Sequence, residues 1–209
     1  MASACLTLFS LAVSRSPYSL IRLVLVTLCI GLLAACSEQA PEFMGSDISD
    51  TNFGTDLALP DTEGTTRSLQ DFDSDVTVVF FGFTQCPDIC PTALAEMAHT
   101  LELLEDDADR VQVAMITVDP ERDTPDLLSS YVQAFDDRFI ALRGSDSQLA
   151  DTADSFKVHY EKVPDDGSDD YTMDHSASFY VFDSKGQPRV LIPGDAPADE
   201  IASDIRQLL

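Results

Sequence analysis

Residues 76–91 read VTVVFFGFTQCPDICP, and this stretch decides the fold. Its first part, Val76–Gly82, is a continuous apolar run, as expected for a strand that is covered on both faces of a parallel sheet. Two cysteines follow, three residues apart, and each of them precedes a proline. Because Pro91 has no N–H and suits the first helical position, the stretch predicts a strand, a cysteine loop and a helix, in that order.

The two prolines also make a prediction about the sulfurs. Pro91 disfavours helical angles at the residue before it, so Cys90 is expected to be the N-cap of the helix or the neighbour of that cap. Partial positive charge at a helix N-terminus lowers the pKa of a thiol and favours the thiolate. Pro87 restricts the turn between the cysteines, so both sulfurs are expected at the mouth of one loop, close enough to bond or to share a soft metal ion.

Outside this stretch, apolar patterns alternate between strands and helices. Strands are expected at 111–118, 139–142, 178–183 and 189–192, and helices after the cysteines, after Thr124, after Ser145 and from Pro197. This order predicts right-handed crossovers and an α/β fold with a central, mostly parallel sheet, helices on both faces and an antiparallel C-terminal hairpin. The expected architecture is thioredoxin-like.

The N-terminal residues 1–35 differ in composition from the rest of the chain and are typical of a lipoprotein signal peptide. The uncharged run Leu23–Leu33 is shorter than the roughly 20 apolar residues that span a bilayer. Small residues at 34–35 then lead to a cysteine, as in a bacterial lipobox, so Cys36 is expected to be the lipidated first residue. An uncleaved signal anchor is the alternative. Both interpretations place the protein outside the cytoplasm, anchored to a membrane on its periplasmic side.

Residues 36–52 are polar and are expected to tether the lipid to one domain at 53–209. The chain carries 12 basic and 37 acidic residues; removing 1–35 deletes two arginines and no acid, which leaves a net charge of −27. So acidic a domain is not expected to bind nucleic acid. The acidic segment 165–170 is interpreted as a solvated, flexible insertion in preference to a docking loop.

The number of cysteines limits the kinds of site that they can form. Cys5 and Cys29 leave with the signal peptide and Cys36 carries lipid, so Cys86 and Cys90 remain in the domain. Outside the cytoplasm such a pair is a disulfide, a metal site, or a site that alternates between the two. A C-x-x-C motif would indicate a thioredoxin-type redox enzyme, whereas three intervening residues leave room for a metal. A structural disulfide is the alternative, although so short a bridge contributes little loop entropy.

A third ligand is expected among the three histidines. His99 lies off the apolar stripe of its helix, and His159 lies near a helix C-terminus, where a cationic ring is favoured anyway. His175 directly precedes the strand expected at 178–183, in the loop that faces the cysteine helix of a thioredoxin-like sheet and that carries a cis-proline in thioredoxins. Two thiolates and an imidazole favour copper, as Cu(I) and Cu(II), over zinc.

Asp88 and Asp174 flank these residues in the sequence. Each could support the metal from outside the ligand set, or only form a turn and add surface charge. Both interpretations remain open.

Four motifs resemble the Sco/SenC family in order and spacing. They are FFGFT at 80–84, CPDICPT at 86–92, VDPERDTP at 118–125 and DHS at 174–176. The resemblance implies copper binding by Cys86, Cys90 and His175. It also implies a role in building the dinuclear copper site of cytochrome c oxidase. Arg143, where a small polar residue is common in the family, and the charged insertion depart from the pattern.

We therefore expect a copper metallochaperone, which binds and delivers copper and is not itself an enzyme. Its expected partners are the copper-site subunit of cytochrome c oxidase and other copper chaperones. The alternative is an extracytoplasmic thiol-disulfide reductase in which Cys86 and Cys90 form a redox-active disulfide and keep the acceptor's cysteines reduced. A peroxiredoxin-like peroxidase is disfavoured, because residues 83–86 lack the upstream proline and threonine spacing of that family.

Overall fold

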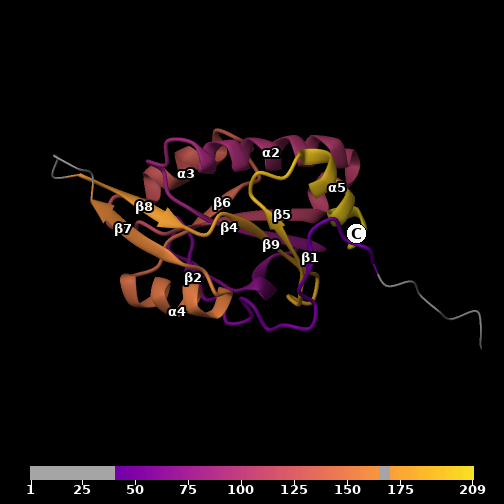
Figure 1. Cartoon of the computed structure of the whole chain (residues 1–209), viewed down its shortest axis with the longest axis horizontal. Coiled ribbons are helices and arrows are strands. Elements are labelled where there is room, and N and C mark those ends of the chain that lie inside the picture. The colour runs from indigo at the N-terminus through magenta and orange to yellow at the C-terminus, as the bar shows by residue number, and fades with distance from the viewer. Residues whose placement is uncertain (1–40, 165–169) are drawn as a thin grey trace, which may run out of the picture. The chain divides into compact units, whose positions relative to one another are not determined.

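The computed structural model describes residues 41–164 and 170–209, in which a six-stranded sheet lies between helices (Figure 1). The strand order is β1-β10-β9-β4-β5-β6. The strands are β1 (Ser46–Asp47), β4 (Val76–Gly82), β5 (Val111–Thr117), β6 (Ile140–Leu142), β9 (Ser178–Asp183) and β10 (Pro188–Pro193). β4, β5 and β6 are parallel, whereas β9 and β10 form the predicted antiparallel hairpin. Because β9 also pairs antiparallel with β4, the sheet is mixed around a parallel core.

Helices cover both faces of this sheet. They are α2 (Ile89–Leu104), α3 (Pro125–Gln133), α4 (Asp146–Phe156) and α5 (Ala198–Arg206), with 3-10 turns at Leu69–Asp71 and Glu105–Arg110. In Figure 1, α2, α3 and α5 lie on one side of the sheet and α4 lies on the other. The helix predicted after Thr124 is confirmed as α3, because Pro125 begins it and the Thr124 side chain accepts a hydrogen bond from Leu127 N–H.

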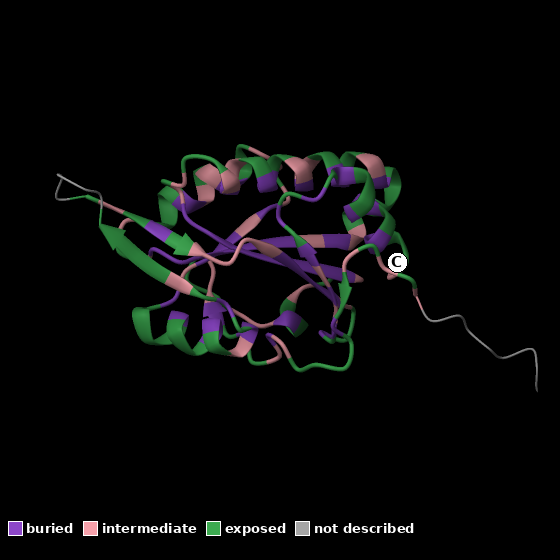
Figure 2. Ribbon diagram, in the orientation of Figure 1, coloured by how far each residue is buried: buried purple, intermediate pink, exposed green. Residues whose placement is uncertain are grey.

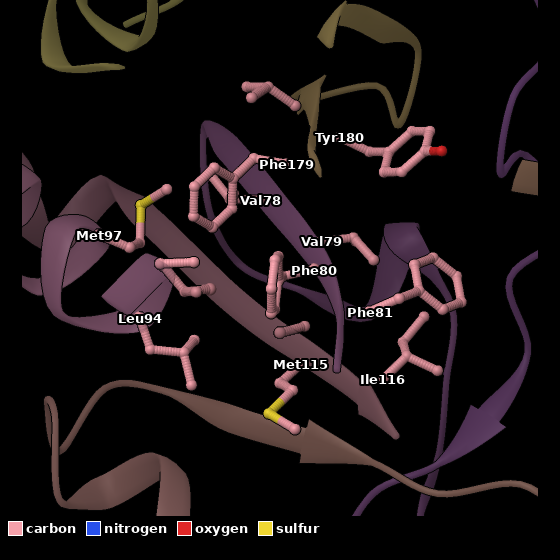
Figure 3. Close-up of a cluster of buried hydrophobic side chains, with 14 of the residues drawn as sticks. Val78, Val79, Phe80, Phe81, Leu94, Met97, Met115, Ile116, Phe179 and Tyr180 are labelled. Carbon is pink, nitrogen blue, oxygen red and sulfur yellow. The ribbon is translucent and has the colours of Figure 1, made fainter. Parts of the chain in front are cut away.

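The side chains of β4 alternate between the two layers. Phe80 points toward Leu94 and Met97 of α2, whereas Phe81 points to the opposite face (Figure 3). There its ring meets that of Phe156 from α4, with the centroids 5.1 Å apart. All seven residues of β4 are buried, and the central strands are the most deeply covered part of the sheet (Figure 2). The apolar run at 76–82 therefore forms the doubly covered strand that its composition predicts.

The folded body begins earlier than the boundary expected at residue 53. β1 pairs with β10 through Ser46 and Asp47, and the N–H groups of Met44 and Gly45 donate to the buried carboxylate of Asp204 at 2.7 and 2.9 Å. These residues belong to the stretch 36–52 that was assigned to the tether. A two-residue edge strand is too short to show the period-two pattern by which strands are recognised.

The expected signal peptide and Cys36 lie outside the described residues. Within residues 41–164 and 170–209, none of the helices combines the length and the apolar character that crossing a bilayer requires.

A two-stranded ribbon was not predicted. β7 (Tyr160–Pro164) and β8 (Tyr171–His175) pair antiparallel and form a sheet of their own, as do β2 (Leu59–Pro60) and β3 (Thr66–Arg67). The ribbon extends away from the helices (orange in Figure 1). β7 is exposed at four of its five residues, and β8 buries only Met173, so the apolar alternation that marks a strand is short and weak here. In the predicted insertion 165–170, only Asp170 lies within the described residues.

Candidate metal centre

The three residues predicted as ligands lie together. The ligand atoms of Cys86, Cys90 and His175 are all within 4.8 Å of one another, and Cys90 Sγ lies 3.4 Å from His175 Nε2. Cys90 is buried, whereas Cys86 and His175 are half-buried. No other group of three or more possible metal ligands of these residue types occurs in the described part of the chain. The cluster therefore has one covered side and one side that faces solvent.

Two separate elements bring these residues together. The cysteines lie between the end of β4 and the first turn of α2, and His175 is the last residue of β8. Gly82, at the end of β4, is required for this close packing. A Cβ atom at that position would lie 2.9 Å from the Phe80 ring and 3.1 Å from Cys90 Sγ. His175 was expected in a loop and instead ends a strand, but it faces the cysteine helix as predicted.

The start of α2 differs from the prediction. The N-cap is Asp88 and the helix begins at Ile89, so Cys90 is the second helical residue and Pro91 the third. Pro91 costs no hydrogen bond there, because the first four N–H groups of a helix have no partner inside it. The N–H of Cys90 donates to Cys86 Sγ at 3.3 Å. The sulfur of Cys86, and not that of Cys90, therefore receives the N–H groups of the helix start.

The two sulfurs consequently differ in acidity. A hydrogen bond from the Cys90 thiol is the largest influence that lowers the pKa of Cys86, and the N–H groups of Asp88 and Cys90 lower it further against the opposing effect of burial. The same bond to Cys86, together with burial, raises the pKa of Cys90. The expectation of a low pKa at Cys90 was therefore wrong. The thiolate is favoured at Cys86, the more exposed sulfur.

The imidazole of His175 is held in one orientation. Its Nδ1 lies 3.1 Å from the carbonyl oxygen of Ser176. Because a carbonyl only accepts, Nδ1 carries the proton, and the lone pair of Nε2 faces Cys90. The rings of Phe80 and Phe83 meet the imidazole edge-on, with interplanar angles of 83° and 86°. His175 is therefore oriented to offer Nε2 to a metal ion beside the two sulfurs.

The other candidates lie outside the cluster of ligand atoms. Asp88 is exposed and acts on the site through its backbone N–H, which bonds the Cys86 sulfur. Asp174 is exposed on β8, where it pairs across the ribbon with Glu161. His99 is exposed on α2, and His159 is exposed with its Nε2 3.9 Å from Glu161.

A set of hydrogen bonds that the sequence did not predict holds β8, the strand that ends at His175. The buried carboxylate of Asp119 accepts hydrogen bonds from Arg122 Nε and, at 2.9 Å, from the Tyr171 hydroxyl. The guanidinium of Arg122 lies 3.7 Å from the centre of the Tyr171 ring and donates to the Tyr171 carbonyl. Asp119 and Arg122 both lie in the motif at 118–125. Its partner lies 52 residues away in the sequence, so no local signal could identify it.

Known proteins resemble this chain in sequence and in fold. Residues 46–209 match the family described as SCO1/SenC. The SCO2-like protein of Rickettsia conorii is 34% identical over 174 residues, which cover 79% of this chain and 85% of that protein. The copper-bound structure of ScoI from Bradyrhizobium japonicum has a TM-score of 0.66 and 34% identity, and the match covers 79% of this chain and 99% of that one.

A second solved structure is BsSco, described as a member of the Sco family of cytochrome c oxidase assembly proteins with a disulfide switch. It has a TM-score of 0.59 and 26% identity, over 79% of this chain and 96% of that one. The likeness to both structures confirms the predicted fold class.

Proposed function

This chain belongs to the SCO1/SenC family, and we propose on that premise that it is a copper metallochaperone. The observation that carries the proposal is the approach of two sulfurs and one imidazole nitrogen to within 4.8 Å of one another. Soft thiolates bind Cu(I) well, and the imidazole nitrogen allows the site to bind Cu(II) too. This set of donors binds copper more tightly than zinc. A solved structure of a relative with copper bound gives further support.

The geometry suggests how copper enters and leaves. The half-buried Cys86 thiolate meets the incoming ion first, and Cys90 becomes the second ligand when its proton passes to solvent. His175 Nε2 needs no proton release, because Nδ1 carries the ring proton. Three protein ligands leave one position of a tetrahedral ion open. A thiolate of the acceptor can bind there before the chaperone releases the ion.

We take the acceptor to be the subunit of cytochrome c oxidase that carries the dinuclear copper site. The description of BsSco as a member of an oxidase assembly family supports this choice. A chaperone that delivers copper must also receive it, so a second copper chaperone is the proposed donor.

The test is a copper titration of the reduced, full-length protein in detergent. We expect it to bind one copper ion per chain in either oxidation state, with an intense thiolate-to-Cu(II) absorption band. Competition with zinc controls for unspecific thiol binding, and zinc should not displace copper. Binding of zinc in preference to copper, or no thiolate band, would contradict the chaperone proposal.

A reductase is the second candidate, and the different acidities of the two cysteines favour it. The Cys86 thiolate would attack a disulfide of the acceptor and form a mixed disulfide. Cys90 would then attack Cys86, which releases the acceptor as a dithiol and leaves a Cys86–Cys90 disulfide. Copper would be incidental in that case. The reaction oxidises one dithiol for each disulfide reduced, so a reductant must restore the pair.

We further propose a lipoprotein, processed after residue 35 and held on the periplasmic side of a membrane by lipid on Cys36. Mass spectrometry of the N-terminus is expected to show a mature chain that begins at a lipid-modified Cys36. The Cys36→Ser variant should lose that modification and keep its copper site, which lies at residues 86–175. An intact Met1, or an unmodified Cys36 in the parent protein, would contradict this proposal.

A further inference from the structure

Asp123 is a fully buried carboxylate in the segment between β5 and α3. It accepts hydrogen bonds from two threonines that belong to different elements. The Thr84 hydroxyl donates at 2.6 Å and the Thr84 N–H at 3.2 Å, and the Thr117 hydroxyl donates at 2.6 Å. Thr84 lies in the loop two residues before Cys86, and Thr117 ends β5. The carboxylate therefore joins the cysteine loop to the central sheet.

The groups that donate to this carboxylate are two hydroxyls and a backbone N–H. The hydroxyl of Thr117 accepts from the N–H of Asp119 at 3.0 Å, so its own hydrogen is free to point at Asp123. The Thr84 N–H can only donate. A buried polar group is costly unless it has hydrogen-bond partners. Loss of either threonine hydroxyl would therefore leave a buried carboxylate oxygen short of a donor.

The backbone around Asp123 is fixed from another side. Arg143, just beyond β6, donates to the carbonyl of Asp123 at 2.8 Å and to that of Pro120 at 2.7 Å. The sequence marked Arg143 as a departure from the family pattern, and the structure gives it a contact. Both β5 and β6 therefore hold Asp123 in place, without any contribution from the cysteines.

We propose that Asp123 is a positioning residue of the copper site, which holds the loop of Cys86 through Thr84. The proposal rests on the copper function above. Its physical basis is preorganisation: a loop that is already fixed loses less conformational freedom when its sulfur binds the ion. Groups that hold metal ligands in place are typically worth about 10- to 100-fold in metal affinity.

Two substitutions test the anchor. Thr84→Val removes the hydroxyl bond at nearly constant volume, and Asp123→Asn replaces one acceptor oxygen by an amide group that only donates. Each is expected to weaken Cu(II) binding by about 10- to 100-fold and to shift the thiolate-to-Cu(II) band. Asp123→Asn disturbs the bonds to both threonines and should have the larger effect, whereas Thr84→Val keeps the bond between Asp123 and Thr117.

The controls separate positioning from stability. Thr84→Ser keeps the hydroxyl and should bind copper as the parent does. Thr100→Val removes a buried hydroxyl that bonds the carbonyls of Glu96 and Ala198, and so matches the chemical change far along α2 from the cysteines. It should lower the thermal unfolding temperature and leave copper affinity and spectrum unchanged. A similar loss of affinity in Thr100→Val would overturn the proposal.

Hydrogen exchange on the reduced, metal-free protein tests the anchor without copper. The backbone amide of residue 84 should exchange faster in Asp123→Asn and Thr84→Val than in the parent, while amides in the middle of α2 keep the parent's protection. Parent-like exchange at Thr84 in both variants, or parent-like copper affinity and spectrum, would refute the role of Asp123. If the parent binds no copper, the chaperone proposal fails. Hydrogen exchange at residue 84 would still show whether Asp123 holds the cysteine loop. If Asp123→Asn does not fold, the Thr84→Val and Thr84→Ser pair decides.

Discussion

Replacing either Cys86 or Cys90 by serine is expected to abolish tight copper binding in both oxidation states. A serine hydroxyl is a hard donor that keeps its proton near neutral pH, so each variant retains one thiolate and one imidazole. Cu(I) affinity should fall at least 1000-fold in competition with a chromophoric chelator, about 4 kcal/mol of binding free energy. The thiolate-to-Cu(II) band should be lost from stoichiometric titrations.

Thermal unfolding controls for damage to the fold. Cys86 is half-buried, so Cys86→Ser should unfold close to the parent temperature. Cys90 is fully buried, and a serine hydroxyl there without a full set of partners costs about 1–3 kcal/mol. Loss of copper binding in the more stable Cys86→Ser variant therefore reports on the ligand alone. Parent-like affinity in that variant would remove Cys86 from the proposed ligand set.

The second large effect is expected from His175→Ala, and it should depend on the oxidation state of copper. Two thiolates can hold Cu(I) by themselves, so its affinity should fall modestly, by about tenfold or less. Cu(II) needs the harder nitrogen donor and should be bound at least 100-fold more weakly. Titrations with the two ions, under anaerobic and aerobic conditions, measure the difference. His159→Ala is the matched control, because that imidazole is exposed and lies outside the cluster.

The same variant separates the chaperone from the reductase. Thiol-disulfide exchange needs the two sulfurs and no imidazole, so a reductase with His175→Ala would still support oxidase assembly in cells. A chaperone would lose that activity together with Cu(II) binding. If copper affinity and oxidase assembly both match the parent, His175 is not a ligand and the chaperone proposal loses its main support.

The central part of the fold could be predicted because its signals are local. The apolar run of β4 and the cap of α3 are each contained in a few residues, and both appear where the sequence places them. The approach of His175 to the cysteines could be predicted from the order of the elements, because His175 comes shortly before β9, the neighbour of β4. The candidate ligand set therefore needed no long-range information beyond the order of the elements.

The parts that could not be predicted depend on distant contacts or on fine geometry. The ribbon of β7 and β8 buries only Met173, which is a weak signal in a sequence, and Tyr171 meets Asp119 only after folding. The acidity of the two sulfurs depends on where α2 begins. Because α2 begins one or two residues earlier than expected, the thiolate is favoured at Cys86 and not at Cys90. Proline spacing alone does not determine a helix start so closely.

The docking of the N-terminal segment limits where a lipid on Cys36 would be attached to the domain. Glu42 and Gln207 exchange two hydrogen bonds, so six residues, which span at most about 21 Å, separate Cys36 from the folded body, against about 60 Å if the body began at residue 53. Gln207 follows α5, and the neighbouring Arg206 donates to the carbonyl of Leu103, near the end of α2 that lies farthest from Cys90. The segment therefore joins the domain at the end of α2 opposite the cysteines. With lipid on Cys36, membrane attachment and the proposed copper exchange would be assigned to opposite ends of one domain.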